Sequence, residues 1–143
     1  RFDLTVNEFT RDLVAGRKLE VFGEQFWRPY CHTRDLAAAC LTAARAAKEE
    51  VNRQAFNVGK DDENYQKRDL IRLIVNQVPQ ASKLIEYVRR DEDPRDYRVR
   101  FGKIREALHF EPRMTVPDGI AEIATAVRDG IIKDPFSRHY RNS

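Results

Sequence analysis

The sequence predicts a mixed fold of helices and short strands, either an α/β fold or an α+β fragment. Apolar residues recur at helical spacing in several stretches, as Phe2, Val6, Phe9 and Leu13 do near the start. Short runs rich in β-branched and aromatic residues lie between these stretches. The 143 residues match the length of one domain, and no internal repeat or linker divides them.

The elements can be placed in order along the chain. Helices are predicted by their apolar stripes and end signals, and strands by compact apolar runs. We predict helices over residues 3–15, 34–48, 67–77, about 104–110 and 115–129, and strands over residues 18–23, 54–58 and 84–88.

Local end signals support several of these bounds. Thr33 is predicted to cap the second helix, and Pro79 ends the third. Thr115 and Asp118 form a Thr-x-x-Asp capping box at the start of the last helix, which Gly130 ends.

The predicted elements also suggest how the chain divides. We expect residues 1–130 to form one lobe. No periodic pattern follows Gly130, so residues 131–143 are expected to be a C-terminal tail.

Arginine dominates the basic residues. The chain has 26 basic and 23 acidic residues, a net charge of +3, and 19 of the basic residues are arginines. The densest stretch, residues 89–100, carries five arginines but also four acidic residues. A groove that follows a nucleic-acid backbone is normally more one-sided in charge, whereas arginine forks suit a small phosphorylated ligand. We therefore expect no nucleic-acid partner.

The two cysteines, Cys31 and Cys40, form no Cys-x-x-Cys pair. Together with His32 they lack a fourth metal ligand at a familiar spacing, so we predict no metal site. We interpret them as buried free thiols of a protein in a reducing, cytoplasmic compartment. The longest apolar run, residues 36–44, is far too short to cross a bilayer, so we expect no membrane contact.

The chain contains no self-contained catalytic constellation. Its six glycines are too far apart for a Gly-x-Gly-x-x-Gly turn or a phosphate loop, and no Gly-x-Ser-x-Gly is present. No tyrosine is followed four residues later by lysine. His32 adjoins a helix start without a nucleophile beside it, so a structural hydrogen bond is expected. We predict no catalytic residue in this chain.

Four segments resemble, in this order, the C-terminal half of an extended short-chain dehydrogenase/reductase. This is the NAD-dependent family of nucleotide-sugar epimerases and dehydratases. The segments are residues 1–9 (RFDLTVNEF), residues 19–35 with LEVFG and RPYCHTRD, residues 56–59 (FNVG), and residues 93–112 with DPRDYRV and LHFEP.

The resemblance implies a substrate-binding lobe for a nucleoside-diphosphate sugar. Arg28 and Arg95 match family arginines that contact the diphosphate. This is chemically reasonable, since each guanidinium can bind two phosphate oxygens. The strand Glu20, Val21 and Phe22 matches the place where the nucleobase packs and meets backbone groups.

Four other matched residues are interpreted as positioning residues: His32, Asp35, Asn57 and Gly59. The last two match the end of a strand that returns to the nucleotide-binding half of the family.

The sequence also departs from the family pattern. Pro29 replaces the usual Asp, Cys31 an Ile or Val, Thr33 a Val, and His109 a Gly. Pro29 removes a carboxylate and a backbone donor beside Arg28, so the geometry of that arginine is the least secure inference.

The family's dinucleotide loop and its Tyr-x-x-x-Lys pair have no match here, and the chain starts at Arg1 without an initiator Met. We therefore expect a fragment, inactive by itself, of a longer NAD- or NADP-dependent enzyme, the parent protein, which is expected to be a homodimer. The unpaired strand 54–58 would expose an edge and favour self-association. Two alternatives remain: a standalone Arg-rich module that binds phosphorylated small molecules, and a helical assembly module.

Overall fold

The computed structural model of the chain describes residues 1–89, 91 and 95–142. Its elements confirm the predicted mixture of helices and short strands. In chain order they are α1 (Thr5–Val14), β1 (Leu19–Phe22), β2 (Trp27–Pro29), α2 (Thr33–Arg45), α3 (Lys48–Val51), η1 (Asp61–Glu63), β3 (Asn64–Gln66), α4 (Lys67–Gln77), η2 (Pro79–Leu84), β4 (Ile85–Val88), α5 (Gly102–Leu108), α6 (Val116–Arg128) and η3 (Arg138–Tyr140).

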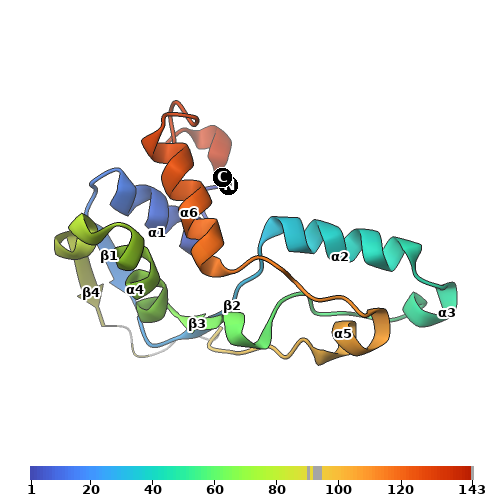
Figure 1. The fold of residues 1–143 in the computed structure, drawn as a ribbon. Helices are drawn as coiled ribbons and strands as arrows, with labels where there is room; N and C mark the ends of the chain where they lie inside the picture. The colour runs from blue at the N-terminus through green and yellow to red at the C-terminus, as the bar shows by residue number, and fades with distance from the viewer. Residues whose placement is uncertain (90, 92–94, 143) are drawn as a thin grey trace.

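The main core lies where α1, α4 and α6 pack together beside a two-stranded parallel ribbon (Figure 1). In that ribbon, β1 and β4 pair with Leu19 opposite Ile85 and Phe22 opposite Val88. Each helix turns its apolar stripe inward, which is the arrangement that the periodicity predicts. The buried residues of this core are Phe9, Leu13, Leu19, Val21, Leu70, Ile71, Ile74, Val78, Ala81, Val116 and Ile120.

A second, smaller core joins α2 to α5. It consists of Ala39 on α2, Ile104 and Leu108 on α5, and Phe110 just beyond α5. Figure 1 shows α2 projecting away from the main core, with α3 and α5 near its far end. Because only one side of α2 is covered, Leu36 and Leu41 remain 49% and 56% exposed.

A short antiparallel ribbon connects the two cores. β2 pairs with β3, with Trp27 opposite Gln66 and Pro29 opposite Asn64. Neither strand was predicted, because three residues are too few to show an alternating pattern. This ribbon positions Arg28, its central residue on β2.

The helix predictions agree closely with the structure where the end signals are strong. The helix over Lys67–Gln77 has the predicted bounds. The capping box of α6 is also confirmed. The Thr115 amide donates to Asp118 Oδ2 at 2.8 Å, and Thr115 Oγ1 accepts from the Asp118 amide at 3.4 Å.

Two of the element predictions are wrong. Residues 54–58 form no strand, because none of the described segments pairs with them. The helix predicted over residues 34–48 ends at Arg45, and the chain restarts as α3. The Ala46 backbone is extended there, and Glu50 Oε2 accepts from the Ala47 amide at 3.1 Å to begin the new helix.

The predicted cap of α2 also needs correction. Thr33 is the first helical residue, and the N-cap is His32, whose Nδ1 accepts from the Arg34 amide at 3.1 Å. The cysteines differ from expectation as well. Cys31 and Cys40 are free thiols, but both are exposed rather than buried: Cys31 precedes α2, and Cys40 is not among the α2 residues that pack on the second core.

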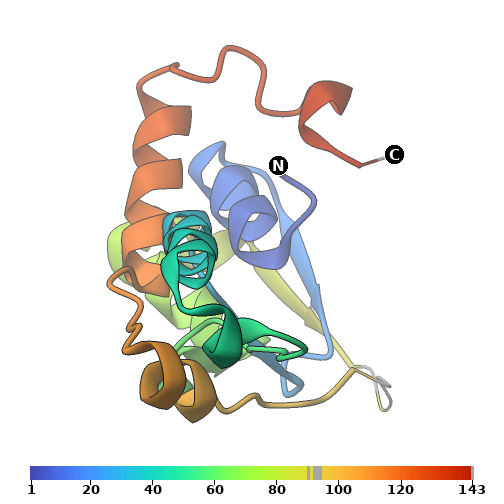
Figure 2. The same cartoon turned by 90° about the vertical axis from the view of Figure 1, so that its right-hand side faces the viewer.

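The last residues fold back onto the start of the chain (Figure 2). The Phe2 amide donates to the Tyr140 carbonyl at 2.6 Å, and the two rings meet edge to face. Arg11 is 1% exposed, and its Cζ lies 4.7 Å from the centre of the Phe136 ring. The segment after residue 130 thus contains short-range structure and packs on α1, which its sequence pattern did not indicate.

One prediction concerns the residue that follows α5. His109 has φ +50° and ψ 33°, the left-handed conformation that glycine adopts readily at this position. A side chain there costs about 1–2 kcal/mol, whereas glycine loses about 0.5–1 kcal/mol more chain entropy on folding. His109→Gly is therefore expected to stabilise the fold by roughly 0.5 kcal/mol in urea unfolding. His109→Ala keeps the Cβ atom and should give no such gain; an equal gain with alanine would contradict this explanation.

Candidate functional site

A cavity of about 480 Å³ lies between α1, the chain around β2, and α6. Its wall contains two of the predicted site residues, Arg28 and His32. The complete lining is Leu4, Thr5, Val6, Asn7, Arg28, Pro29, Tyr30, Cys31, His32, Thr33, Glu63, Met114, Thr115, Val116, Gly119, Glu122 and Ile123.

The first turn of α1 forms one side of this cavity. Its N-cap, Leu4, has no side chain that can accept a hydrogen bond, and none caps the helix. Leu4 therefore leaves the leading amides of α1 without a side-chain cap, at a helix end that carries partial positive charge. Arg28 lies in the same wall, so the cavity combines a guanidinium with a helix N-terminus.

Arg28 is half-buried and held by its neighbours. Its Nη1 donates to the Trp27 carbonyl at 2.6 Å, and its Cζ lies 5.7 Å from the centre of the Tyr97 ring. The ring face attracts the cation and orients it. Pro29 takes part in the β2–β3 pairing despite its missing amide.

Arg95 is exposed and lies beside the strand that carries Arg28. The Trp27 amide donates to Asp96 Oδ1 at 2.7 Å, and the Tyr97 amide donates to the Trp27 carbonyl at 3.4 Å. These bonds bring the segment of Arg95 next to that of Arg28, although 67 positions separate the two residues in the sequence. The matched residues Asp93 and Pro94 lie outside the described residues.

His32 and Asp35 connect α2 to the chain that leads into α6. His32 Nε2 lies 3.2 Å from Glu122 Oε2, and its other ring nitrogen caps α2, so it forms the structural hydrogen bond expected of it. Asp35 is 5% exposed, and its two oxygens accept from the amides of Arg113 at 3.0 Å and Met114 at 2.9 Å. Both residues hold the cavity wall in place.

The β1 residues lie outside this cavity. Val21 is fully buried in the main core, whereas Phe22 is 44% exposed and Glu20 is also exposed. The Phe22 carbonyl accepts from Lys67 Nζ at 2.6 Å. A role for this strand in holding a nucleobase stays a prediction.

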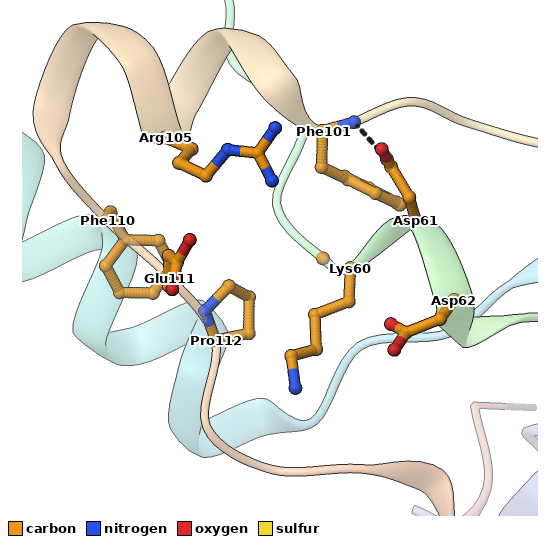
Figure 3. Close-up of a pocket in the computed structure, with 9 residues that line it drawn as sticks. Lys60, Asp61, Asp62, Phe101, Arg105, Phe110, Glu111 and Pro112 are labelled. Atoms are coloured by element: carbon orange, nitrogen blue, oxygen red, sulfur yellow. Dashed lines mark hydrogen bonds between the residues drawn. The ribbon is translucent and has the colours of Figure 1, made fainter.

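Asn57 and Gly59 lie at a second cavity or near it. Gly59 lines a pocket of about 300 Å³ between α5 and the loop of residues 59–62, whereas Asn57 is exposed and is not part of its wall. Figure 3 shows Arg105 pointing across this pocket toward that loop, and the Asp61 carboxylate accepting from the Phe101 amide. The pocket holds no other predicted site residue.

Tyr30 and Glu63 belong to the first cavity and were not predicted as site residues. Burial raises the pKa of Tyr30 to about 12, although the charge of Arg28 lowers it in part. The buried Tyr30 hydroxyl has no partner in hydrogen-bonding geometry among the described residues. Glu63 is 5% exposed, accepts from the Val116 amide at 2.7 Å, and lies 3.2 Å from the Tyr65 hydroxyl. Tyr30 lies in the resembling motif, but Glu63 carries no local signal.

Glu63 should make the stability of the fold depend on pH. Burial raises its pKa, which the Val116 amide and the Tyr65 hydroxyl oppose. The folded state thus favours the protonated carboxyl, whose contribution is full below the unfolded pKa of about 4.3 and is lost as pH rises through the folded value. Glu63→Gln cannot titrate. In urea unfolding, the unfolding free energy of wild type minus that of Glu63→Gln should therefore fall as the pH rises above the unfolded pKa of about 4.3.

The exposed Glu106→Gln variant serves as the control for removing one glutamate charge. If the difference between wild type and Glu63→Gln stays constant over this pH range, the folded-state pKa of Glu63 is not raised.

Known structures share this fold. A dTDP-glucose 4,6-dehydratase from Bacillus anthracis in complex with NAD has a TM-score of 0.73 at 18% identity, over 95% of this chain and 43% of its own. A UDP-glucose 4-epimerase from Thermotoga maritima with UDP-glucose has a TM-score of 0.72 at 22% identity, over 90% and 40%. A short-chain dehydrogenase/reductase superfamily protein from Agrobacterium tumefaciens with bound NAD has a TM-score of 0.65 at 27% identity, over 82% and 35%.

The fold is therefore that of part of a short-chain dehydrogenase/reductase, and the chain spans about 40% of the length of the first of these structures. Residues 5–59 also match the model of the NAD dependent epimerase/dehydratase family. The resemblance to the extended short-chain dehydrogenases that act on nucleotide sugars is thus confirmed.

Among the described residues, the turn after β1 does not fit the pyrophosphate of a dinucleotide cofactor. The turn that follows β1 leads into β2 rather than into a helix N-terminus that could hold a pyrophosphate. Within the described ranges, no group of three or more His, Cys, Asp or Glu is placed to hold a metal ion. Nor does that part of the chain contain a helix with the length and apolar character needed to cross a membrane.

Proposed function

We propose that this chain is the substrate-binding portion of an NAD- or NADP-dependent nucleotide-sugar epimerase or dehydratase, and that it binds the diphosphate of the sugar nucleotide. The observation that carries the proposal is the cavity that brings Arg28 together with the N-terminal turn of α1. A diphosphate suits both features, because guanidinium forks and helix N-termini each bind phosphate oxygens.

The acidic groups in the same wall do not oppose an anion strongly. Glu122 pairs with His32 and with Arg34 Nη2, each at 3.2 Å. Glu63 already accepts from the Val116 amide, and burial favours its neutral form by raising its pKa. Arg95 adds a second guanidinium on the segment bonded to Trp27, so that two forks can serve two phosphates.

In this proposal the chain binds and orients the substrate but performs no chemistry. The cofactor of the parent protein would accept a hydride from the sugar, while a tyrosine outside this sequence would remove a proton. Several solved structures of this fold contain NAD, and another contains NADPH. The isolated chain is therefore expected to be inactive with UDP- or dTDP-sugars and added NAD. Turnover of a sugar nucleotide by the isolated chain would contradict the proposal that it only binds the substrate.

We also propose a compartment and an oligomeric state for the parent protein. The two free thiols favour a reducing, cytoplasmic compartment. A homodimeric parent stays a prediction. So does self-association of this chain, although its predicted basis, a strand at residues 54–58, is absent. A chain that stays monomeric at high concentration in light scattering would exclude it.

Calorimetric titration of the chain with UDP and dTDP tests the diphosphate site. Arg28→Ala and Arg95→Ala should each weaken binding about tenfold or more, since each removes a charge-assisted contact worth about 1.5–3 kcal/mol. Arg128→Ala removes an exposed arginine near the end of α6 and should leave the affinity unchanged.

Two results would overturn the proposal. One is the absence of binding heat with any nucleoside diphosphate, which would favour the assembly module. The other is binding that neither arginine variant weakens. Equal binding of all phosphorylated small molecules, with no preference for nucleoside diphosphates, would instead favour the standalone phospholigand module.

A further inference from the structure

Residues 95–101, here called the strap, cross the β2–β3 ribbon and are held mainly by side chains. Asp96 Oδ1 accepts from the Trp27 amide at 2.7 Å. Further along, the Asn64 side chain both accepts from the Val99 amide at 2.9 Å and donates to the Val99 carbonyl at 3.0 Å.

The sequence of β2 explains why side chains replace a regular strand pairing. Pro29 has no amide hydrogen, so the strap cannot continue a backbone ladder along β2 past Arg28. Asn64 lies opposite Pro29 on β3. Its side-chain amide supplies both a hydrogen-bond donor and an acceptor to the strap, whereas the backbone of Pro29 can only accept. Asp61 then fixes the end of the strap by accepting from the Phe101 amide at 2.8 Å.

The Asp96–Trp27 bond lies between the two arginines of the proposed site. Trp27 directly precedes Arg28, and Asp96 directly follows Arg95. This bond, together with the weaker one from the Tyr97 amide to the Trp27 carbonyl at 3.4 Å, sets the spacing of the two backbones that carry these arginines. Tyr97, the next residue on the strap, places its ring 5.7 Å from Arg28 Cζ, so the two bonds also position the surface against which Arg28 rests.

We propose that Asp96 is a positioning residue that holds Arg95 beside Arg28, so that both bind a single diphosphate. This inference rests on the proposed function. Asp96 itself need not touch the ligand: its carboxylate is committed to the Trp27 amide. Because two guanidiniums must match two linked phosphates, a small displacement of the strap costs affinity for a diphosphate more than for a monophosphate.

The test compares UDP with UMP in calorimetric titrations of the chain. Asp96→Ala should weaken UDP binding about tenfold, and UMP binding by less than about threefold. Asp96→Asn keeps an oxygen that can accept from the Trp27 amide, so it should restore most of the UDP affinity. In the Arg95→Ala background, Asp96→Ala should cause little further loss, because the arginine that it positions is absent.

Asp134→Ala is the matched control. Asp134 is also an exposed aspartate whose Oδ1 accepts a backbone amide, that of Phe136 at 3.1 Å, but it lies on the segment that packs on α1. It should leave both affinities unchanged. Thermal unfolding of each variant shows whether the fold persists.

The outcomes separate this inference from the function on which it rests. Equal weakening of UDP and UMP by Asp96→Ala, no recovery with Asp96→Asn, or additive losses with Arg95→Ala would each overturn the positioning role while leaving the diphosphate site intact. If Arg28→Ala and Arg95→Ala both leave UDP binding unchanged, the site itself fails, and the role of Asp96 fails with it.

Discussion

Replacing Asp35 by alanine is expected to destabilise the fold by about 2–4 kcal/mol. The side chain is 5% exposed, and its two oxygens accept from the amides of Arg113 and Met114. Alanine would leave both amides without their acceptor at a partly buried position, and each such loss costs about 1–3 kcal/mol. Urea unfolding followed by circular dichroism measures the change.

Two companion variants make this prediction specific. Asp35→Asn has one acceptor oxygen and turns an NH₂ group toward the second amide, so it should recover at most part of the lost stability. Asp129→Ala removes an exposed aspartate at the end of α6 and should stay within about 0.5 kcal/mol of wild type. If Asp35→Ala were as mild as Asp129→Ala, the two backbone bonds would not be holding α2 to the chain before α6.

Gly59→Ala should cost about 1–3 kcal/mol through a clash in a packed region. A Cβ atom on Gly59 would lie 2.7 Å from both Cε1 and Cζ of the Phe101 ring. The ring cannot easily withdraw, because Phe101 is 7% exposed and its amide is bonded to Asp61. This close approach gives Gly59 a packing role at the position where the sequence predicted a positioning residue.

Gly102→Ala is the control for this clash. A Cβ atom there would meet the flexible side chains of Glu106 at 3.4 Å and Arg105 at 4.0 Å, and alanine favours the helix that Gly102 begins. It should therefore be neutral or slightly stabilising in the same unfolding assay. In addition, Phe101→Leu makes room beside residue 59, so the cost of Gly59→Ala should shrink in that background. Simple additivity of the two changes would contradict the clash.

The strongly periodic helices could be predicted because their signals are local. The stripes of α1, α4 and α6 and the capping box at Thr115 each act within a few residues, and the structure preserves all of them. The break between α2 and α3 could not be predicted. Alanines at positions 46 and 47 favour a continuous helix, and the chain turns there where Ala46 and Val51 pack against the second core.

Some residues of the candidate site could be predicted from the sequence and others could not, again because only local signals are visible there. Arg28, His32 and Asp35 lie in one continuous motif, so resemblance found them together. Glu63 and Asp96 were not predicted as site residues, because the role of each depends on a hydrogen bond to a residue far away in the sequence. The partner is the Val116 amide for Glu63 and the Trp27 amide for Asp96. No pattern near Glu63 distinguishes it from an ordinary surface carboxylate, and the motif of residues 93–99 pointed to Arg95 rather than to Asp96.

The sequence by itself determined the class of fold, most of the helices, and the arginine that faces the main cavity. Periodicity, caps and motif order depend on neighbours along the chain, and those neighbours are visible in the sequence. Only the tertiary structure decided which carboxylates are buried, how β2 pairs with β3, and that Asp96 and Tyr97 are bonded to Trp27. These features depend on contacts between segments far apart in the chain, such as the 78 positions between Asp35 and Arg113, and such contacts form only when the whole chain packs.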